Sequence, residues 1–212
     1  WSSDVCSSDL FNSPLPTKAG DKHKWAQLYG SAAGLAIVEA AKASAAAERG
    51  PILLLANDTA SMNRLEDELH FYASGSELPI LTFPDQETLP YDRFSPHPDI
   101  TSRRLEVLTR LPYLEQGIIL STLPTIMQRV PPCDYIERHA FSLAIGETLH
   151  RDKLRLRLEQ SGYHSVSQVM EHGEYAFRGS IIDLFPMGAK TPYRIDLFDD
   201  EVETLSTFDQ ES

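Results

Sequence analysis

Apolar and polar positions follow two different patterns along the chain, and the pattern changes at Pro131 and Pro132. Between Asn12 and Pro132, helix-like and strand-like segments alternate, which favours a layered α/β domain. After the two prolines, one charged helical segment precedes several strand-like runs, as is typical of a small α+β domain. We therefore predict two domains, residues 11–138 and residues 139–212.

Local signals place the elements of the first domain. The run ILLLA is continuously apolar, as in a parallel strand that is covered on both faces. Gly50 and Pro51 end the alanine-rich helix before it, and Asn57, Asp58 and Thr59 are candidate caps for the helix after it. In chain order we expect a helix at 25–49, a strand at 52–56, a helix bearing Met62, Leu65 and Leu69, a strand at 79–83, a proline-rich loop at 89–100, a helix at 100–111, a strand at 117–122 and a short helix at 124–130.

In the second domain, we expect a strand at 141–145, a charged helix at 151–161 and further strands to the end. A period of two places Tyr193, Ile195 and Leu197 on one face of the run PYRIDLF. Arg194, Asp196 and Phe198 then share the other face. A large aromatic among charges is unusual on a solvent-facing side.

Arg178 precedes Gly179, a residue type that often marks a bulge or a close backbone approach within a strand. If the two strands are neighbours, Arg178, Arg194 and Phe198 share one face, and arginine and aromatic side chains are typical anchors of protein interfaces. Alternatively, Phe198 caps a minor core while both arginines pair with Asp196, Asp199 and Asp200. The pattern leaves both interpretations open, and it assigns residues 181–185 to the core.

Composition narrows the function classes. The chain has 212 residues and a formal net charge of -12, from 19 Lys and Arg against 31 Asp and Glu, which disfavours nucleic-acid binding by bulk electrostatics. Its two cysteines, Cys6 and Cys133, support neither a disulfide framework nor a zinc site. No apolar run approaches the roughly 20 residues of a membrane span, so a cytoplasmic protein is expected. Residues 1–10 look like a foreign segment, and the abrupt end suggests a fragment of a longer protein.

The segment LYGSAAGLAI invites a phosphate-loop interpretation, because glycines and a serine precede an apolar helix. The required pattern is GxxxxGK[ST]. Here Gly30 and Ser31 are followed by Gly34, and Leu35 and Ala36 stand about where the lysine and the hydroxyl are needed. We therefore predict a degenerate, non-functional phosphate loop, in a helix whose small residues pack tightly against a sheet.

Other candidate chemistry is weak. Ser95 lies near Asp92, His97 and Asp99, but no oriented base or GxSxG elbow supports a hydrolytic triad. We expect this loop to be structural, with Arg103 and Arg104 solvated at the start of the next helix. The kinase-like HRDK at His150 is interpreted as a capped helix start, since the other kinase elements are missing. No catalytic residue and no metal site are predicted.

Four stretches carry a resemblance to a known family: TLPYDRFSPHPDITSRR, TLPTIMQRV, QVMEHGEYAFRGSIIDLFPMG and PYRIDLFDDEVETL. They resemble the N-terminal module of the bacterial transcription-repair coupling factor (Mfd) family, from about Leu15 to the end. The resemblance implies a module homologous to the excinuclease protein UvrB, with a partial, helicase-like domain 1a derived from a P-loop NTPase fold at 11–138. Domain 2, at 139–212, would dock the excinuclease protein UvrA.

The resemblance also implies the site and the partners. The family's docking residues fall on Arg178, Arg194 and Phe198. In the longer parent, ATP and Mg would bind in motor domains that this chain lacks, and double-stranded DNA and RNA polymerase would be further partners; this chain alone is expected to be neither an enzyme nor cofactor-bound. The alternatives are a UvrB-like ATP-dependent helicase and a DNA-clamping module. The missing lysine and threonine in LYGSAAGLAI favour the coupling-factor module.

Overall fold

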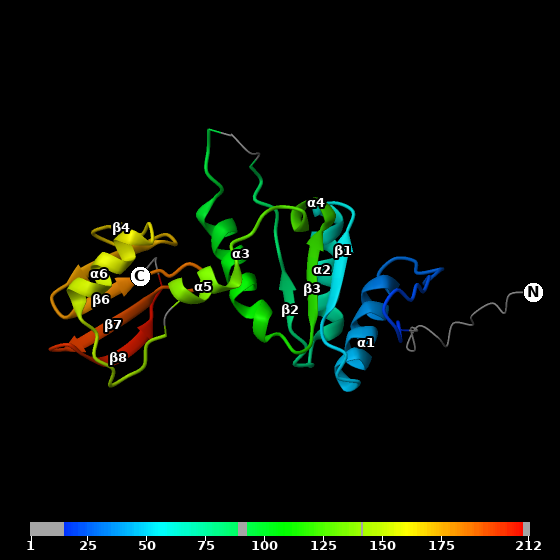
Figure 1. Cartoon of the computed structure of the whole chain (residues 1–212), viewed down its shortest axis with the longest axis horizontal. Helices are drawn as coiled ribbons and strands as arrows, with labels where there is room; N and C mark the ends of the chain where they lie inside the picture. Colours follow the sequence, from blue (N-terminus) through cyan, green and yellow to red (C-terminus); the bar gives the residue numbers. More distant parts are fainter. Residues whose placement is uncertain (1–14, 89–92, 141, 210–212) are drawn as a thin grey trace, which may run out of the picture. The chain divides into compact units, whose positions relative to one another are not determined.

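A computed structural model describes residues 15–88, 93–140 and 142–209, and the segment interpreted as foreign lies outside these residues (Figure 1). The chain forms two compact units. One comprises residues up to Asp85 together with Tyr113–Arg129, and the other comprises Gln86–Pro112 with Val130–Ser212. This division by spatial contact differs from the sequence boundary near residue 138, because it places 86–112 and 130–138 with the second unit. The proposed domain boundary stays a prediction.

The first unit contains a three-stranded parallel sheet with strand order β1-β3-β2. Its elements are α1 (Ala32–Ala46), β1 (Ile52–Ala56), α2 (Thr59–Ala73), β2 (Ile80–Thr82), β3 (Ile118–Thr122) and α4 (Leu123–Ile126). Side chains of α1 and α2 form one core with Ile118 and Leu120 of β3. Each predicted strand and α2 are confirmed, and Asp58 caps α2 by accepting a hydrogen bond from the Ser61 amide at 2.7 Å.

Three predictions for this unit are wrong in detail. The short helix predicted at 124–130 ends at Ile126 as α4. The alanine-rich helix begins at Ala32 instead of residue 25, after Gly30 takes a left-handed φ of 58°. The strand β1 is covered on one face only, because Leu53 and Leu55 are 53% and 40% exposed. An apolar run therefore does not by itself show that both faces of a strand are buried.

The second unit contains a five-stranded mixed sheet with the order β4-β5-β6-β7-β8, in which β4 and β5 are parallel and the other pairs are antiparallel. Its elements are α3 (Pro98–Arg110), α5 (Cys133–His139), α6 (Arg151–Gln160), β4 (His164–Ser165), β5 (Glu174–Arg178), β6 (Ile181–Leu184), β7 (Tyr193–Phe198) and β8 (Glu201–Thr207), and a 3₁₀ turn covers Leu111–Tyr113. Leu154 and Leu158 of α6 pack on one face of the sheet, against Tyr175, Ile182 and Ile195.

One segment of this unit differs from its prediction. The predicted strand at 141–145 has no strand structure at its described residues, 142–145, and α5 lies just before it. Residues 143–145 are apolar, as in many strands, but a strand forms only where the segment pairs with another strand. The charged helix is confirmed as α6, although His150 at its N-cap contacts Asp200 at 3.1 Å rather than the helix. Within the described part of the chain, no helix is both long and apolar enough to cross a bilayer.

Candidate protein-docking face

The strand register puts the candidate docking residues on one face of the second sheet. Arg178 of β5 pairs with Ile181 of β6, which in turn pairs with Asp196 of β7. Because side chains on a strand alternate, Arg194 and Phe198 point to the same side as Asp196. We call this side the arginine face and define it by Arg178, Asp183, Arg194, Asp196 and Phe198. The strands that carry Arg178 and Arg194 are not direct neighbours, since β6 lies between them, but the register still places both arginines on one face.

Arg194 is held by a carboxylate in the middle of the sheet. Its Nε and Nη2 donate to the two carboxylate oxygens of Asp183 at 2.6 and 2.9 Å, and Asp183 is only 4% exposed. This hydrogen bonding raises the pKa of the Arg194 guanidinium above its usual value. The guanidinium carbon also lies 4.9 Å from the centre of the Phe208 ring, within the range of a cation–π contact. Arg194 is therefore fixed on two sides, yet 42% of its side chain remains exposed.

The sequence did not identify Asp183 as the partner of Arg194, because the predicted ion pairs involved Asp196, Asp199 and Asp200. A signal was present: Asp183 is a single acid in the apolar run SIIDLF, and a carboxylate buried in a core strand needs a partner. The other acids have other neighbours. Asp196 accepts a hydrogen bond from the Ser180 hydroxyl at 3.0 Å, and Asp200 contacts His150.

Arg178 is the last residue of β5 and lies beside the turn to β6, at one end of the arginine face. It is exposed, and its Nη2 donates to the carbonyl oxygen of Ser167. Gly179 marks neither a bulge nor a close approach: it lies with Ser180 in the turn between β5 and β6, and its φ of 58° suits the left-handed region that such two-residue turns require. Arg178 thus stands where the hairpin turns, with its charge turned to solvent.

Phe198 does not cap a minor core, and that interpretation is wrong. It is 71% exposed at the end of β7, where it pairs with Glu201 across a two-residue turn. The aromatic that extends the small core on this side is Phe208, which packs with Val169, Ala176 and Phe185. A phenylalanine exposed to this degree beside charged residues is a feature of interaction surfaces.

The predicted phosphate loop lies at the start of α1. Gly30 precedes the helix, Ser31 is its N-cap, and Gly34, Leu35 and Ala36 lie within its first two turns. A phosphate loop connects a strand to a helix, whereas described residues 15–31 contain no strand. Gly34 is instead a packing position, because a Cβ there would lie 2.9 Å from Cβ of Glu68 in α2.

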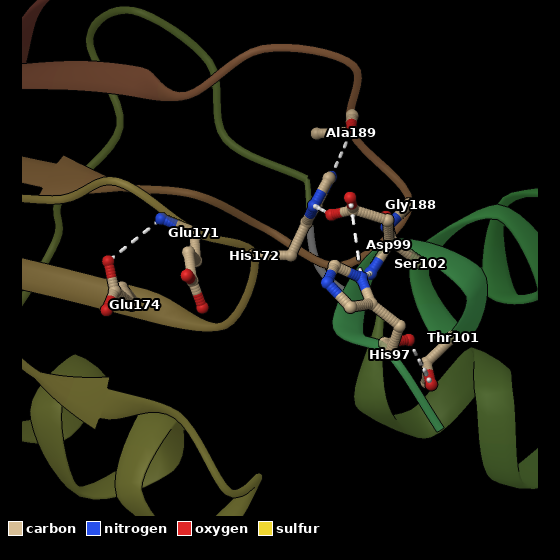
Figure 2. Close-up of polar contacts among 9 residues, drawn as sticks. All are labelled: His97, Asp99, Thr101, Ser102, Glu171, His172, Glu174, Gly188 and Ala189. Carbon is tan, nitrogen blue, oxygen red and sulfur yellow. Dashed lines mark hydrogen bonds and ion pairs between the residues drawn. The ribbon is translucent and has the colours of Figure 1, made fainter. Parts of the chain in front are cut away.

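The structure brings His97 and Asp99 together, with 3.5 Å between Nδ1 and Oδ2, but no hydrogen bond among the described residues joins Ser95 to either of them, and Asp92 lies outside the described residues. Figure 2 shows the His172 ring between Asp99 and Ala189, with distances of 2.9 Å from Nδ1 to the Asp99 carboxylate and 2.9 Å from Nε2 to the Ala189 carbonyl oxygen. The Ser102 hydroxyl accepts a hydrogen bond from the Gly188 amide at 2.8 Å. These contacts join α3 to the ends of the sheet strands and thereby explain why α3 belongs to the second unit.

One further sequence prediction about α3 is wrong. Arg104 was expected to be solvated together with Arg103, but it is only 5% exposed, whereas Arg103 is exposed. Adjacent helix residues point about 100° apart, so one of two neighbouring arginines faces the packed side of the helix. The helix α3, which was expected in the first domain, belongs to the unit that carries the arginine face.

The sequence of this chain is similar to those of known proteins. Residues 141–212 match the family model of the UvrB interaction domain, and this range contains all five residues of the arginine face. The transcription-repair-coupling factor of Escherichia coli K12 is 44% identical over 198 residues, which are 93% of this chain and 17% of that protein. The chain is homologous to part of the transcription-repair-coupling factors.

Two further coupling factors show the same relationship. The Haemophilus influenzae protein is 40% identical over 200 residues, or 94% of this chain, and the Bacillus subtilis protein is 27% identical over 161 residues, or 76% of this chain. The chain spans only 17%, 17% and 14% of the lengths of these three coupling factors. An alignment of 198 residues in a chain of 212 necessarily includes most of both units. The coupling-factor relationship therefore extends beyond the UvrB interaction domain.

Proposed function

We propose that this chain is a recruitment module of a transcription-repair-coupling factor, which binds the excinuclease protein UvrA through the arginine face. The observation that carries the proposal is the exposed Phe198 on the same sheet face as Arg178 and Arg194, within the range that matches the UvrB interaction domain. In the longer parent, the module would couple the removal of stalled RNA polymerase from double-stranded DNA to excision repair, and ATP-dependent translocation would belong to other domains.

The physical roles of the three residues differ. Phe198 would be the apolar anchor, because burying a phenylalanine that is 71% exposed in the free chain removes a large apolar area from water. Arg178 and Arg194 would donate charge-assisted hydrogen bonds to acceptor groups of the partner. Interface anchors of these types commonly contribute more than the many contacts around them.

Binding of purified UvrA to the 212-residue chain tests the proposal, with affinity measured by isothermal titration calorimetry. We expect Arg178→Ala and Phe198→Ala each to weaken binding by about tenfold or more. Phe71→Ala is a matched control, since Phe71 is a phenylalanine of the first unit with a similar exposure of 72%. Unchanged binding by the Arg178→Ala/Phe198→Ala double variant would show that the arginine face is not the contact surface.

We also propose that the parallel-sheet unit derives from a helicase-like fold and does not bind nucleotide. The absence of a strand in residues 15–31 and the packing role of Gly34 support the second part of this proposal, that the unit does not bind nucleotide. Titration with ATP and Mg²⁺ separates it from the UvrB-like alternative, for which saturable, magnesium-dependent binding is expected. A DNA-clamping module would instead show DNA binding that falls steeply with salt.

A further inference from the structure

The strongest unexplained feature of the arginine face is the buried carboxylate of Asp183. It lies on the central strand β6, directly opposite Arg194 of β7 and Ala176 of β5. A buried carboxylate costs several kcal/mol unless a partner compensates it. Both of its oxygens are bonded to Arg194.

The pair limits what Arg194 can do. Asp183 occupies Nε and Nη2, and the Phe208 ring lies 4.9 Å from the guanidinium carbon. Nη1 makes no hydrogen bond with a described residue, so it is the nitrogen that remains for a partner. Since a free arginine side chain has about 2 kcal/mol of rotamer entropy to lose on binding, a guanidinium that is already fixed loses less when a partner binds.

We propose that Asp183 is a positioning residue of the docking face: it holds the Arg194 guanidinium in one orientation and balances its charge, so that Arg194 presents a directed N–H donor instead of a mobile cation. This inference rests on the proposed function. It gives the two arginines different roles, because Arg178 donates to the neutral carbonyl of Ser167 and forms no ion pair with a described acidic residue. Arg194 then suits an oxygen acceptor in the plane of its guanidinium, while Arg178 supplies the charge.

The chain offers a matched control for Asp183. Asp85 is a half-buried acid of the first unit, outside the arginine face, and it accepts hydrogen bonds from the Thr125 hydroxyl and the Gln128 side-chain amide at 3.0 and 3.1 Å. Asp183→Asn and Asp85→Asn therefore make the same chemical change, but only the first alters the group that holds Arg194. Nuclear magnetic resonance of the arginine Nε–H groups reports the motion of Arg194 without any partner present.

The test measures binding of UvrA to the full 212-residue chain and to these variants. We expect Asp183→Asn to weaken binding about tenfold or more, Asp85→Asn to change it by less than about threefold, and Asp183→Asn/Arg194→Ala to bind no more weakly than Arg194→Ala alone. The Arg194 Nε–H signal should become mobile in Asp183→Asn and stay rigid in Asp85→Asn. Arg194→Lys, which keeps a charge beside Asp183 but loses the two-point contact, should also bind more weakly.

Three outcomes overturn the inference: Asp183→Asn binds like the unaltered chain, Arg194→Lys binds like it, or the double variant loses the sum of the two single effects. The proposed function fails in a different way, when the unaltered chain does not bind UvrA or when Arg178→Ala and Phe198→Ala have no effect. In that case Asp183 is a structural residue only. If Asp183→Asn does not fold, Arg194→Lys and the resonance of the unaltered chain decide the matter.

Discussion

Removing the Arg194 side chain should destabilise the second sheet measurably, even though this residue lies partly at the surface. Arg194→Ala leaves the Asp183 carboxylate, which is 4% exposed, without the two hydrogen bonds of 2.6 and 2.9 Å. Breaking a fully buried charge pair in this way costs about 3–5 kcal/mol. Because 42% of the Arg194 side chain is exposed, water can enter the space it leaves, so we expect a smaller loss of about 1–3 kcal/mol.

Hydrogen exchange of the backbone amides in β6 and β7 measures this loss in the sheet itself, which matters in a chain with two units. Exchange through opening of the sheet should become roughly 5- to 150-fold faster in Arg194→Ala. Arg178→Ala is the control, with a change within about 0.5 kcal/mol, because Arg178 is exposed and its partner is a backbone carbonyl. If the β6 and β7 amides of Arg194→Ala exchange no faster than those of Arg178→Ala, the pair with Asp183 does not stabilise the sheet.

Three further predictions concern an exposed aromatic residue, the contact between α3 and the sheet, and two buried tyrosines. Phe198→Ala should leave the free energy of unfolding unchanged within about 0.5 kcal/mol, because Phe198 is 71% exposed; a marked fall in the melting temperature would show that it packs in the folded chain. His172→Ala should speed hydrogen exchange in α3, since it removes the contacts with Asp99 and Ala189, whereas His164→Ala at an exposed position should not. Burial raises the pKa of Tyr163 and of Tyr175, so the folded chain holds these phenolic protons where an unfolded chain releases them. The stability that these two tyrosines contribute should be fully present below about pH 10 and decline as the pH rises above it. An ultraviolet titration in which both tyrosines ionise like free tyrosine would contradict this.

Much of the fold could be predicted because its signals are local. The apolar run at 52–56, the Asp58 cap and the charged helix at 151–160 depend on residues that are near one another in the chain, and the structure has each of them. The predictions failed where a distant segment decides the conformation. Residues 142–145 have no strand partner, and the packing of α3 buries Arg104. Neither fact can be read from a local sequence pattern.

The candidate site divides in the same way. The alternation of side chains determined from sequence alone that Arg194 and Phe198 share one face of their strand, because that property depends only on the period of an extended backbone. Tertiary pairing alone places β6 between the two strands that carry the arginines, sets Asp183 opposite Arg194, and brings Phe208 instead of Phe198 to the small core. These facts come from strand order and register, which bring together residues far apart in the chain, and no spacing within one segment records them.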